Sequence, residues 1–93
     1  MLTFTAKLTV HAGKEQEFEA TMRDVIPRVR EEPENHAYIV HRAVDNACIL
    51  MFCEEYTDQA ALEAHRRHLR ELGVDLRAVL EGPPVLEFYE KLA

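Results

Sequence analysis

The segment from Glu54 to Leu72 combines residue types that suit proton transfer. His65 interrupts an apolar stripe that also contains Leu62 and Leu69, so its imidazole should project towards the protein interior with those leucines. Burial lowers the pKa of an imidazole and keeps it neutral at pH 7, with one ring nitrogen free to accept a proton. A general base needs the same state. The alternative is a histidine that simply packs in the core, and the two interpretations differ only in access to a cavity.

Glu54 is the candidate partner of His65. It lies on a predicted strand in the same alternating register as Leu50 and Phe52, whereas Glu55 points to the opposite face. A carboxylate on a covered face needs a partner or becomes protonated. Contact with the His65 imidazole would select one tautomer of the ring. The alternative is that both acids lie in water at the end of the strand.

Aromatic residues are the candidates for a substrate pocket, although most aromatics in a small domain belong to the core. We expect Tyr56 to act with Glu54 and His65, and Phe52, Tyr38 and Phe88 to contact the substrate. Tyr89 is a further possible pocket residue. Four further basic residues of the 54–72 segment are expected to form a solvated helix face, and these are Arg66, Arg67, His68 and Arg70.

Composition restricts the classes of function. The chain has 93 residues, which is the size of one domain, here 1–93, and its net charge is −6. That charge argues against binding to nucleic acid or to anionic membranes. No apolar run approaches the length of a membrane span, and Cys48 and Cys53 are expected to be free thiols on opposite faces of one strand, so the cytoplasm is the expected location.

Metal and nucleotide sites are not indicated. The histidines show no convincing ligand spacing with an acid or thiol, and we assign no role to His11, His36 or His41. The chain also lacks the glycine-rich signatures of nucleotide binding. We therefore expect no cofactor.

Hydrophobic periodicity predicts a ferredoxin-like α+β fold. An alternating pattern predicts a first strand over 2–10, and a helical stripe follows up to Pro33, with Pro27 expected to kink or loosen that helix. The remaining elements are strands over 36–44 and 48–56, a helix capped by Thr57 or Asp58, a short helical stretch over 74–80 and a last strand over 85–92. The order β-α-β-β-α-β indicates an antiparallel sheet with both helices on one face. Because the strand over 48–56 is apolar on both sides, we expect a second subunit to cover the other face.

The chain resembles the antibiotic biosynthesis monooxygenase family. The resemblance covers most of its length and lies in the segments FTAKLTVHAGKEQEFEATMRDVI, FCEEYTDQAALEAHRRHL and GPPVLEFYEKL. It implies a dimeric α+β barrel with a cavity between sheet and helices. It also places Glu54, Tyr56 and His65 at the strand-end acid, the aromatic and the helix histidine of the family pattern.

Family members include cofactor-free oxygenases of quinols and polycyclic phenols, haem-degrading enzymes and an isomerase that processes a phosphorylated signalling molecule. Haem degradation is disfavoured, because Ala6 stands where those enzymes have asparagine and the chain has no tryptophan. The resemblance therefore implies a homodimer that acts on a small aromatic substrate with oxygen. Two alternatives stay open: a proton-transfer isomerase of a small carbonyl compound, and a ligand-binding barrel without catalysis.

Overall fold

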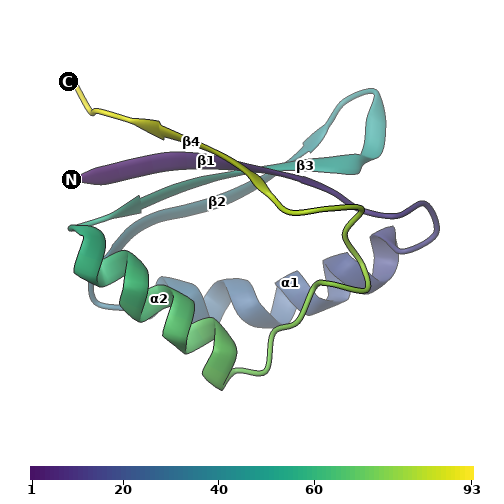
Figure 1. The fold of residues 1–93 in the computed structure, drawn as a ribbon, viewed down its shortest axis with the longest axis horizontal. Coiled ribbons are helices and arrows are strands. Elements are labelled where there is room, and N and C mark those ends of the chain that lie inside the picture. Colours follow the sequence, from purple (N-terminus) through teal and green to yellow (C-terminus); the bar gives the residue numbers. More distant parts are fainter.

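A four-stranded antiparallel sheet carries two helices on one face in the computed structural model, which describes all 93 residues (Figure 1). The order along the chain is β-α-β-β-α-β, which confirms the predicted ferredoxin-like fold. Across the sheet the strands run β2-β3-β1-β4, so the first and third strands occupy the centre. The elements are β1 (Leu2–Thr9), α1 (Glu15–Arg30), β2 (Asn35–Ala43), β3 (Asn46–Tyr56), α2 (Gln59–Glu71) and β4 (Val85–Tyr89).

Strand register decides which side chains face the helices. Phe4 of β1 stands opposite Glu54 of β3, and Ala6 stands opposite Phe52. Phe4, Ala6 and Phe52 are all buried beneath the helices, and side chains two residues apart on a strand share a face. Glu54 therefore lies on the covered face, as its alternation with Phe52 predicts.

Helix α1 closes one half of the core. Its buried residues are Phe18, Met22, Val25 and Val29, which match the predicted stripe. The helix continues through Pro27 as one element, with Pro27 on the exposed side, and it ends at Arg30 rather than at Pro33. Residues 31–34 form a turn between α1 and β2, and this turn carries part of the site described below.

The N-cap residue fixes where helix α2 begins. The Asp58 carboxylate accepts a hydrogen bond from the backbone N–H of Ala61 at 2.9 Å, as an N-cap aspartate should. Ala61, Leu62 and His65 are the buried residues of the helix. The cap and the apolar stripe thus turn His65 towards the sheet.

The prediction of a short helical stretch over 74–80 is wrong. Gly73 has φ of 75°, and Val74 donates its backbone N–H to Leu69 at 3.0 Å, which terminates α2 in the manner of a Schellman motif. The chain beyond makes a single turn, and Leu80 forms an isolated bridge with Val10. The apolar residues that suggested a helix instead cover the end of the core and the cavity.

The second face of the sheet carries apolar side chains that no helix covers. Ile39 is 49% exposed and Val85 is 58% exposed. Cys53 stands opposite Ile39 in the register, and Lys7 of β1 separates Met51 from Val85. No helix in the structure is long and apolar enough to cross a membrane.

Candidate functional site

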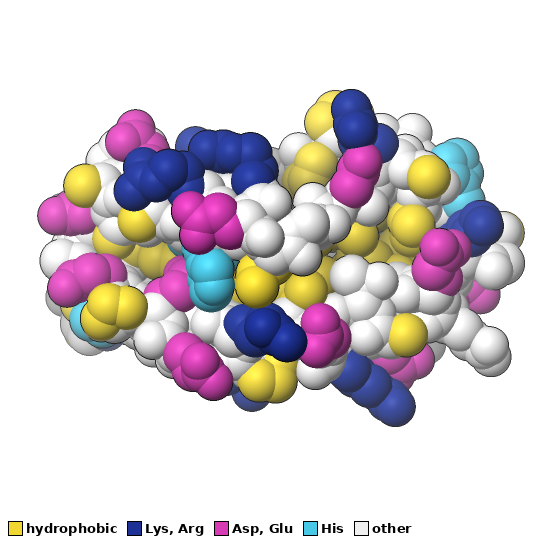
Figure 2. All heavy atoms as spheres, turned by 90° about the horizontal axis from the view of Figure 1, so that it is seen from below, with side chains coloured by type: hydrophobic (Ala, Val, Ile, Leu, Met, Phe, Trp, Pro, Cys, Tyr) yellow, Lys and Arg dark blue, Asp and Glu magenta, His cyan; other side chains and the backbone are white.

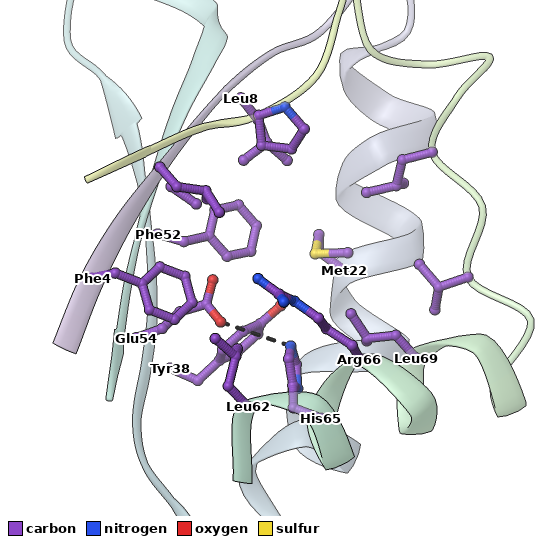
Figure 3. A pocket seen from close by; sticks show the side chains of 15 residues that line it. Phe4, Leu8, Met22, Tyr38, Phe52, Glu54, Leu62, His65, Arg66 and Leu69 are labelled. Carbon is purple, nitrogen blue, oxygen red and sulfur yellow. Dashed lines mark ion pairs between the residues drawn. The ribbon is translucent and has the colours of Figure 1, made fainter. Parts of the chain in front are cut away.

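A cavity of about 250 Å³ lies between the helices and the sheet (Figure 3). Seen from the helix side, apolar side chains gather in the hollows between the helices, with charged side chains around them (Figure 2). Eleven of the fifteen lining residues are hydrophobic. The polar lining residues are Tyr38, Glu54, His65 and Arg66. The cavity is therefore mainly apolar, with few groups able to ionise.

His65 lies in this cavity with both ring nitrogens facing carboxylates. Its Nδ1 is 3.1 and 3.0 Å from the two carboxylate oxygens of Glu32, and its Nε2 is 3.7 Å from Oε1 of Glu54. The ring is 5% exposed and lies between Tyr38 and Tyr56, with ring centroids 5.7 and 5.1 Å away. The imidazole is thus held in one orientation and screened from bulk water.

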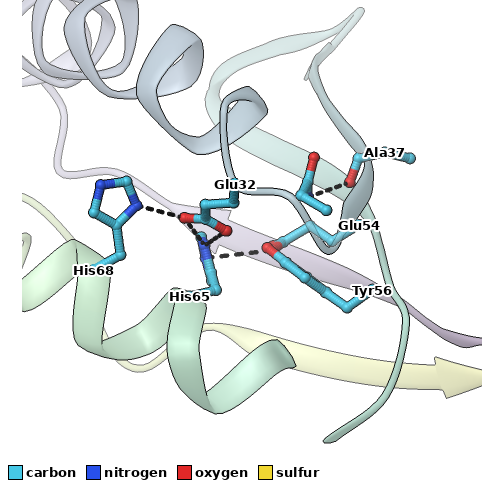
Figure 4. A network of polar contacts seen from close by, with 7 residues as sticks. Glu32, Ala37, Glu54, Tyr56, His65 and His68 are labelled. Atoms are coloured by element: carbon cyan, nitrogen blue, oxygen red, sulfur yellow. Dashed lines mark hydrogen bonds and ion pairs between the residues drawn. The ribbon is translucent and has the colours of Figure 1, made fainter. Parts of the chain in front are cut away.

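Glu32 is the residue that the sequence did not single out. It lies in the turn after α1, where a segment with several acids gives no periodic signal for choosing one of them. In the structure its carboxylate also accepts a hydrogen bond from Nδ1 of His68 at 2.7 Å, so one acid joins two histidines of α2 (Figure 4). His68, expected on a solvated face, is instead partly buried against Glu32.

The contact with Glu32 assigns the tautomer of His65. A carboxylate accepts hydrogen bonds, so the proton of neutral His65 lies on Nδ1 and the lone pair lies on Nε2. Burial lowers the pKa of His65, while the hydrogen bond and charge of Glu32 raise it and the charges of His68 and Arg66 lower it. Burial is the largest of these effects, so His65 is neutral at pH 7 with Nε2 able to accept a proton.

Glu54 is a buried acid whose ionisation is finely balanced. Its Oε1 accepts a hydrogen bond from the Tyr56 hydroxyl at 2.8 Å. Burial raises the pKa of Glu54 to about 7, and nearby Glu32 adds to this, while the Tyr56 hydrogen bond and Arg66 lower it. Both the protonated and the ionised form of Glu54 are therefore present near neutral pH.

The aromatic residues divide into two groups. Tyr38 and Phe52 line the cavity, as expected for substrate contacts. Phe88 of β4 is not among the lining residues; it packs on Phe4, with ring centroids 5.1 Å apart, and is 52% exposed. Tyr56 is fully buried behind Glu54 and does not line the cavity. Burial and the adjacent Glu54 raise the pKa of Tyr56, which keeps its hydroxyl protonated and donating.

Arg66 differs from expectation in one respect. It is exposed on the solvated face of α2, as expected, yet its side chain also lines the cavity. Helix geometry explains the difference: Arg66 follows His65 directly, at the border between the buried and the exposed faces, and a long side chain there can reach inward. No group of three or more acidic, histidine or cysteine side chains is arranged to hold a metal ion.

The arrangement has the parts of an acid–base site. A neutral imidazole is oriented by one carboxylate through Nδ1, and its free Nε2 is directed towards a second carboxyl group beside an apolar cavity. A hydroxyl or an activated C–H of a bound ligand could give its proton to such a nitrogen. The orienting carboxylate would stabilise the imidazolium that forms.

The chain belongs to the antibiotic biosynthesis monooxygenase family, whose model matches residues 1–70. No curated protein matches the chain. The family match agrees with the fold and leaves the substrate and the reaction open.

Solved structures agree with the fold. A Methanosarcina mazei protein is similar at 28% identity and a TM-score of 0.86, with 98% of this chain and 92% of that chain covered. A Pseudomonas aeruginosa protein is similar at 24% identity and a TM-score of 0.88, with 99% and 94% covered. A proposed antibiotic biosynthesis monooxygenase from Nitrosomonas europaea has a TM-score of 0.90 at 18% identity, with each chain covered completely.

Removing the charge of Glu32 should make His65 harder to protonate. In Glu32→Gln the hydrogen-bonding atoms remain but the negative charge is lost, so the pKa of His65 should fall further. Titration of the His65 ring resonances by NMR measures this directly. Glu31→Gln, a change at the exposed neighbour, is the matched control and should leave the His65 titration in place. An unchanged His65 titration in Glu32→Gln would contradict the assigned contact.

Replacing Glu54 with glutamine should stabilise the protein at high pH. Because the folded-state pKa of Glu54 is raised to about 7 from an ordinary 4.5, its contribution to stability is largest below pH 4.5 and is lost as the pH rises to 7. Glu54→Gln cannot ionise, so its gain in unfolding free energy over the wild type should be larger at pH 8 than at pH 5, by about 2 kcal/mol. Urea denaturation at both pH values measures it. Glu55→Gln controls for the loss of a negative charge in general. An equal pH-dependent gain in unfolding free energy in Glu55→Gln would contradict the raised pKa of Glu54 as the cause.

Proposed function

We propose that this protein is a cofactor-independent monooxygenase that oxidises a quinol or a small polycyclic phenol with molecular oxygen. The observation that carries the proposal is the neutral His65, whose free Nε2 faces a mainly apolar cavity beside Glu54. Membership of the antibiotic biosynthesis monooxygenase family supports the same reaction class. Electron-rich aromatic substrates suit such a cavity, because their rings match its apolar wall and their hydroxyl matches its base.

The reaction balances without an additional reductant. His65 takes the hydroxyl proton of the substrate, and the electron pair of the O–H bond stays on the substrate as a phenolate. The electron-rich phenolate supplies four electrons to O₂ in all. Two go to the oxygen atom that becomes bonded to a ring carbon, and two reduce the other oxygen atom, which leaves as water with two hydrogens from the substrate. The overall change is SH₂ + O₂ → S=O + H₂O, so the substrate itself is the reductant.

The volume of the cavity limits the size of the substrate. Ligand pockets commonly occupy about 300–1,000 Å³, and this cavity of about 250 Å³ is just below that range. A one-ring or two-ring compound is therefore favoured over a larger polyketide. Tyr38 and Phe52 supply aromatic walls. Of the two tyrosines near His65, Tyr38 is the one in position to touch a substrate, and Tyr56 acts by holding Glu54.

A proton-transfer isomerase is the second candidate, and the raised pKa of Glu54 favours it. A carboxyl group with a pKa of about 7 can return a proton to a carbon atom after His65 has removed one elsewhere. Such a reaction consumes no oxygen. The non-catalytic alternative, a barrel that only binds a ligand, predicts no turnover under either condition.

Loss of the His65 base should abolish oxygen consumption. With a quinol such as 1,4-naphthohydroquinone, the wild type should consume oxygen faster than the uncatalysed background, and His65→Gln should be slower by about 10² or more. An oxygen electrode measures the rate, and His11→Gln, a change at an exposed histidine, is the matched control. Equal rates in His65→Gln and the wild type would overturn the proposed role of His65. Conversion of a carbonyl substrate without oxygen would instead favour the isomerase.

A homodimer is part of the proposal. The outer sheet face has apolar side chains at Ile39, Met51 and Cys53, and β4 is exposed along its whole length. Partly exposed apolar side chains on one face of a sheet suit a partner surface. A second copy of this chain packed sheet to sheet would cover them and would close a barrel of the type found in the family.

A charge on the outer face should therefore dissociate the dimer. Ile39→Asp places a carboxylate at the expected interface, whereas Val44→Asp places one at a fully exposed turn position and is the matched control. Sedimentation velocity should show a dimer for the wild type and Val44→Asp, and a shift towards monomer for Ile39→Asp. A monomeric wild type would contradict the expected dimer directly.

A further inference from the structure

Arg66 is the one cationic side chain among the residues that line the cavity. The other lining residues able to ionise are Tyr38, Glu54 and His65, and the rest are apolar apart from the backbone. Figure 3 shows the Arg66 side chain extending from α2 into the cavity, towards Phe52 and Glu54 of β3. The guanidinium thus lies beside the base and the buried acid, although its long side chain starts at the exposed border of the helix.

Arg66 has no partner within the chain. Arg23, Arg28, Arg42 and Arg77 each pair with a carboxylate. Arg30 donates to the backbone carbonyl of Tyr38. Arg66 forms no ion pair or hydrogen bond, even with Glu54 on the facing wall of the cavity. Arg67 and Arg70 are likewise unpaired, but neither of them lines the cavity. A guanidinium carries five donors in a fixed plane and stays charged at every physiological pH, so its free donors are available to a ligand oxygen.

We propose that Arg66 is the anion-binding residue of the cavity and that it holds the oxyanion formed when His65 takes a proton from the ligand. The inference rests on the proposed function and deepens it. It specifies the ligand as a one-ring or two-ring aromatic compound with an acidic hydroxyl or a carboxylate. In the proton transfer the ligand O–H bond breaks, the proton moves to Nε2 of His65, and the electron pair stays on the oxygen beside Arg66.

Charge balance explains why the site needs this residue. Proton transfer to a neutral imidazole creates a cation and an anion in a mainly apolar cavity. Glu32 lies on the far side of His65 and stabilises the imidazolium, but no other cation is available to the new oxyanion. When Glu54 is ionised it repels that oxyanion. Arg66 compensates for both effects, because a charged donor directed at a developing negative charge stabilises it most strongly where water is excluded.

The inference can be tested by binding, without turnover. The probes are 2-naphthoate, which is an anion at pH 7.5, and 2-naphthamide, a neutral compound of nearly the same shape. Isothermal titration under nitrogen should show that the wild type binds 2-naphthoate about tenfold or more tightly than 2-naphthamide. Arg66→Gln should remove that preference while leaving the affinity for 2-naphthamide within about twofold. Arg66→Lys should keep part of it, because a point charge remains.

The matched control is Arg67→Gln, a change of the same charge at the next position of α2, which does not line the cavity. It should retain the preference for 2-naphthoate. Loss of the preference in Arg67→Gln to the same extent, or its persistence in Arg66→Gln, would overturn the assignment. Circular dichroism should be used to check that each variant is folded before titration. If Arg66→Gln does not fold, Arg66→Lys tests the inference in its place.

A second readout reports the oxyanion itself. The ionised form of 2-naphthol absorbs at longer wavelength than the neutral form, so its absorbance at fixed pH gives the ionised fraction of the bound compound. The wild type should increase that fraction relative to free 2-naphthol, and Arg66→Gln should reverse the increase. Failure of the proposed function is distinguishable: absence of oxygen consumption with an intact Arg66-dependent preference would reject the monooxygenase and keep the anion site. Absence of binding by both naphthalene probes would reject both.

Discussion

The carboxylate of Glu32 between His65 and His68 is the contact on which the site depends. It connects the turn after α1 to two successive turns of α2, elements that are distant in the sequence, through hydrogen-bond distances of 2.7–3.1 Å. A carboxylate that is only slightly exposed requires such partners. In return it fixes the tautomer of His65, so the free lone pair is directed away from Glu32 and towards Glu54. Without this acid the imidazole could place its proton on either nitrogen, and its orientation would be set by packing alone.

The second carboxylate plays a different role because its environment differs. Glu54 has only the Tyr56 hydroxyl as a hydrogen-bond donor, and its Oε1 is 3.7 Å from His65, beyond hydrogen-bond distance. Burial therefore dominates, and the group titrates near pH 7. The two carboxyl groups beside His65 therefore differ: Glu32 accepts hydrogen bonds from two histidines and orients the imidazole, whereas the ionisation of Glu54 is balanced near pH 7.

The fold and two residues of the site, Glu54 and His65, could be predicted from the sequence, because hydrophobic periodicity indicates which face of a strand or helix is buried. Alternation along β1 and β3 and the stripe of α2 report burial directly, and they placed Glu54 and His65 on facing walls. Glu32 could not be found this way, because it lies in a turn whose path depends on where α1 ends. The burial of His68 and the reach of the exposed Arg66 into the cavity were missed for a related reason: a position at the border of a helix face is exposed by spacing, but its side chain can reach inward. The predicted helix over 74–80 failed because its apolar residues are buried by tertiary packing rather than by helical periodicity.

These differences bear on how function varies within a shared fold. Solved structures with 18–28% identity keep the sheet and helices almost unchanged, since those are fixed by apolar periodicity that many sequences satisfy. Glu32 lies in a turn, and Arg66 lies at the border of a helix face, so neither is needed to fill the core. Such positions can change without loss of the fold, and each change alters the charge balance around His65. The charge balance around His65 in this chain is therefore set by residues outside the core, and the fold alone does not determine what the site does.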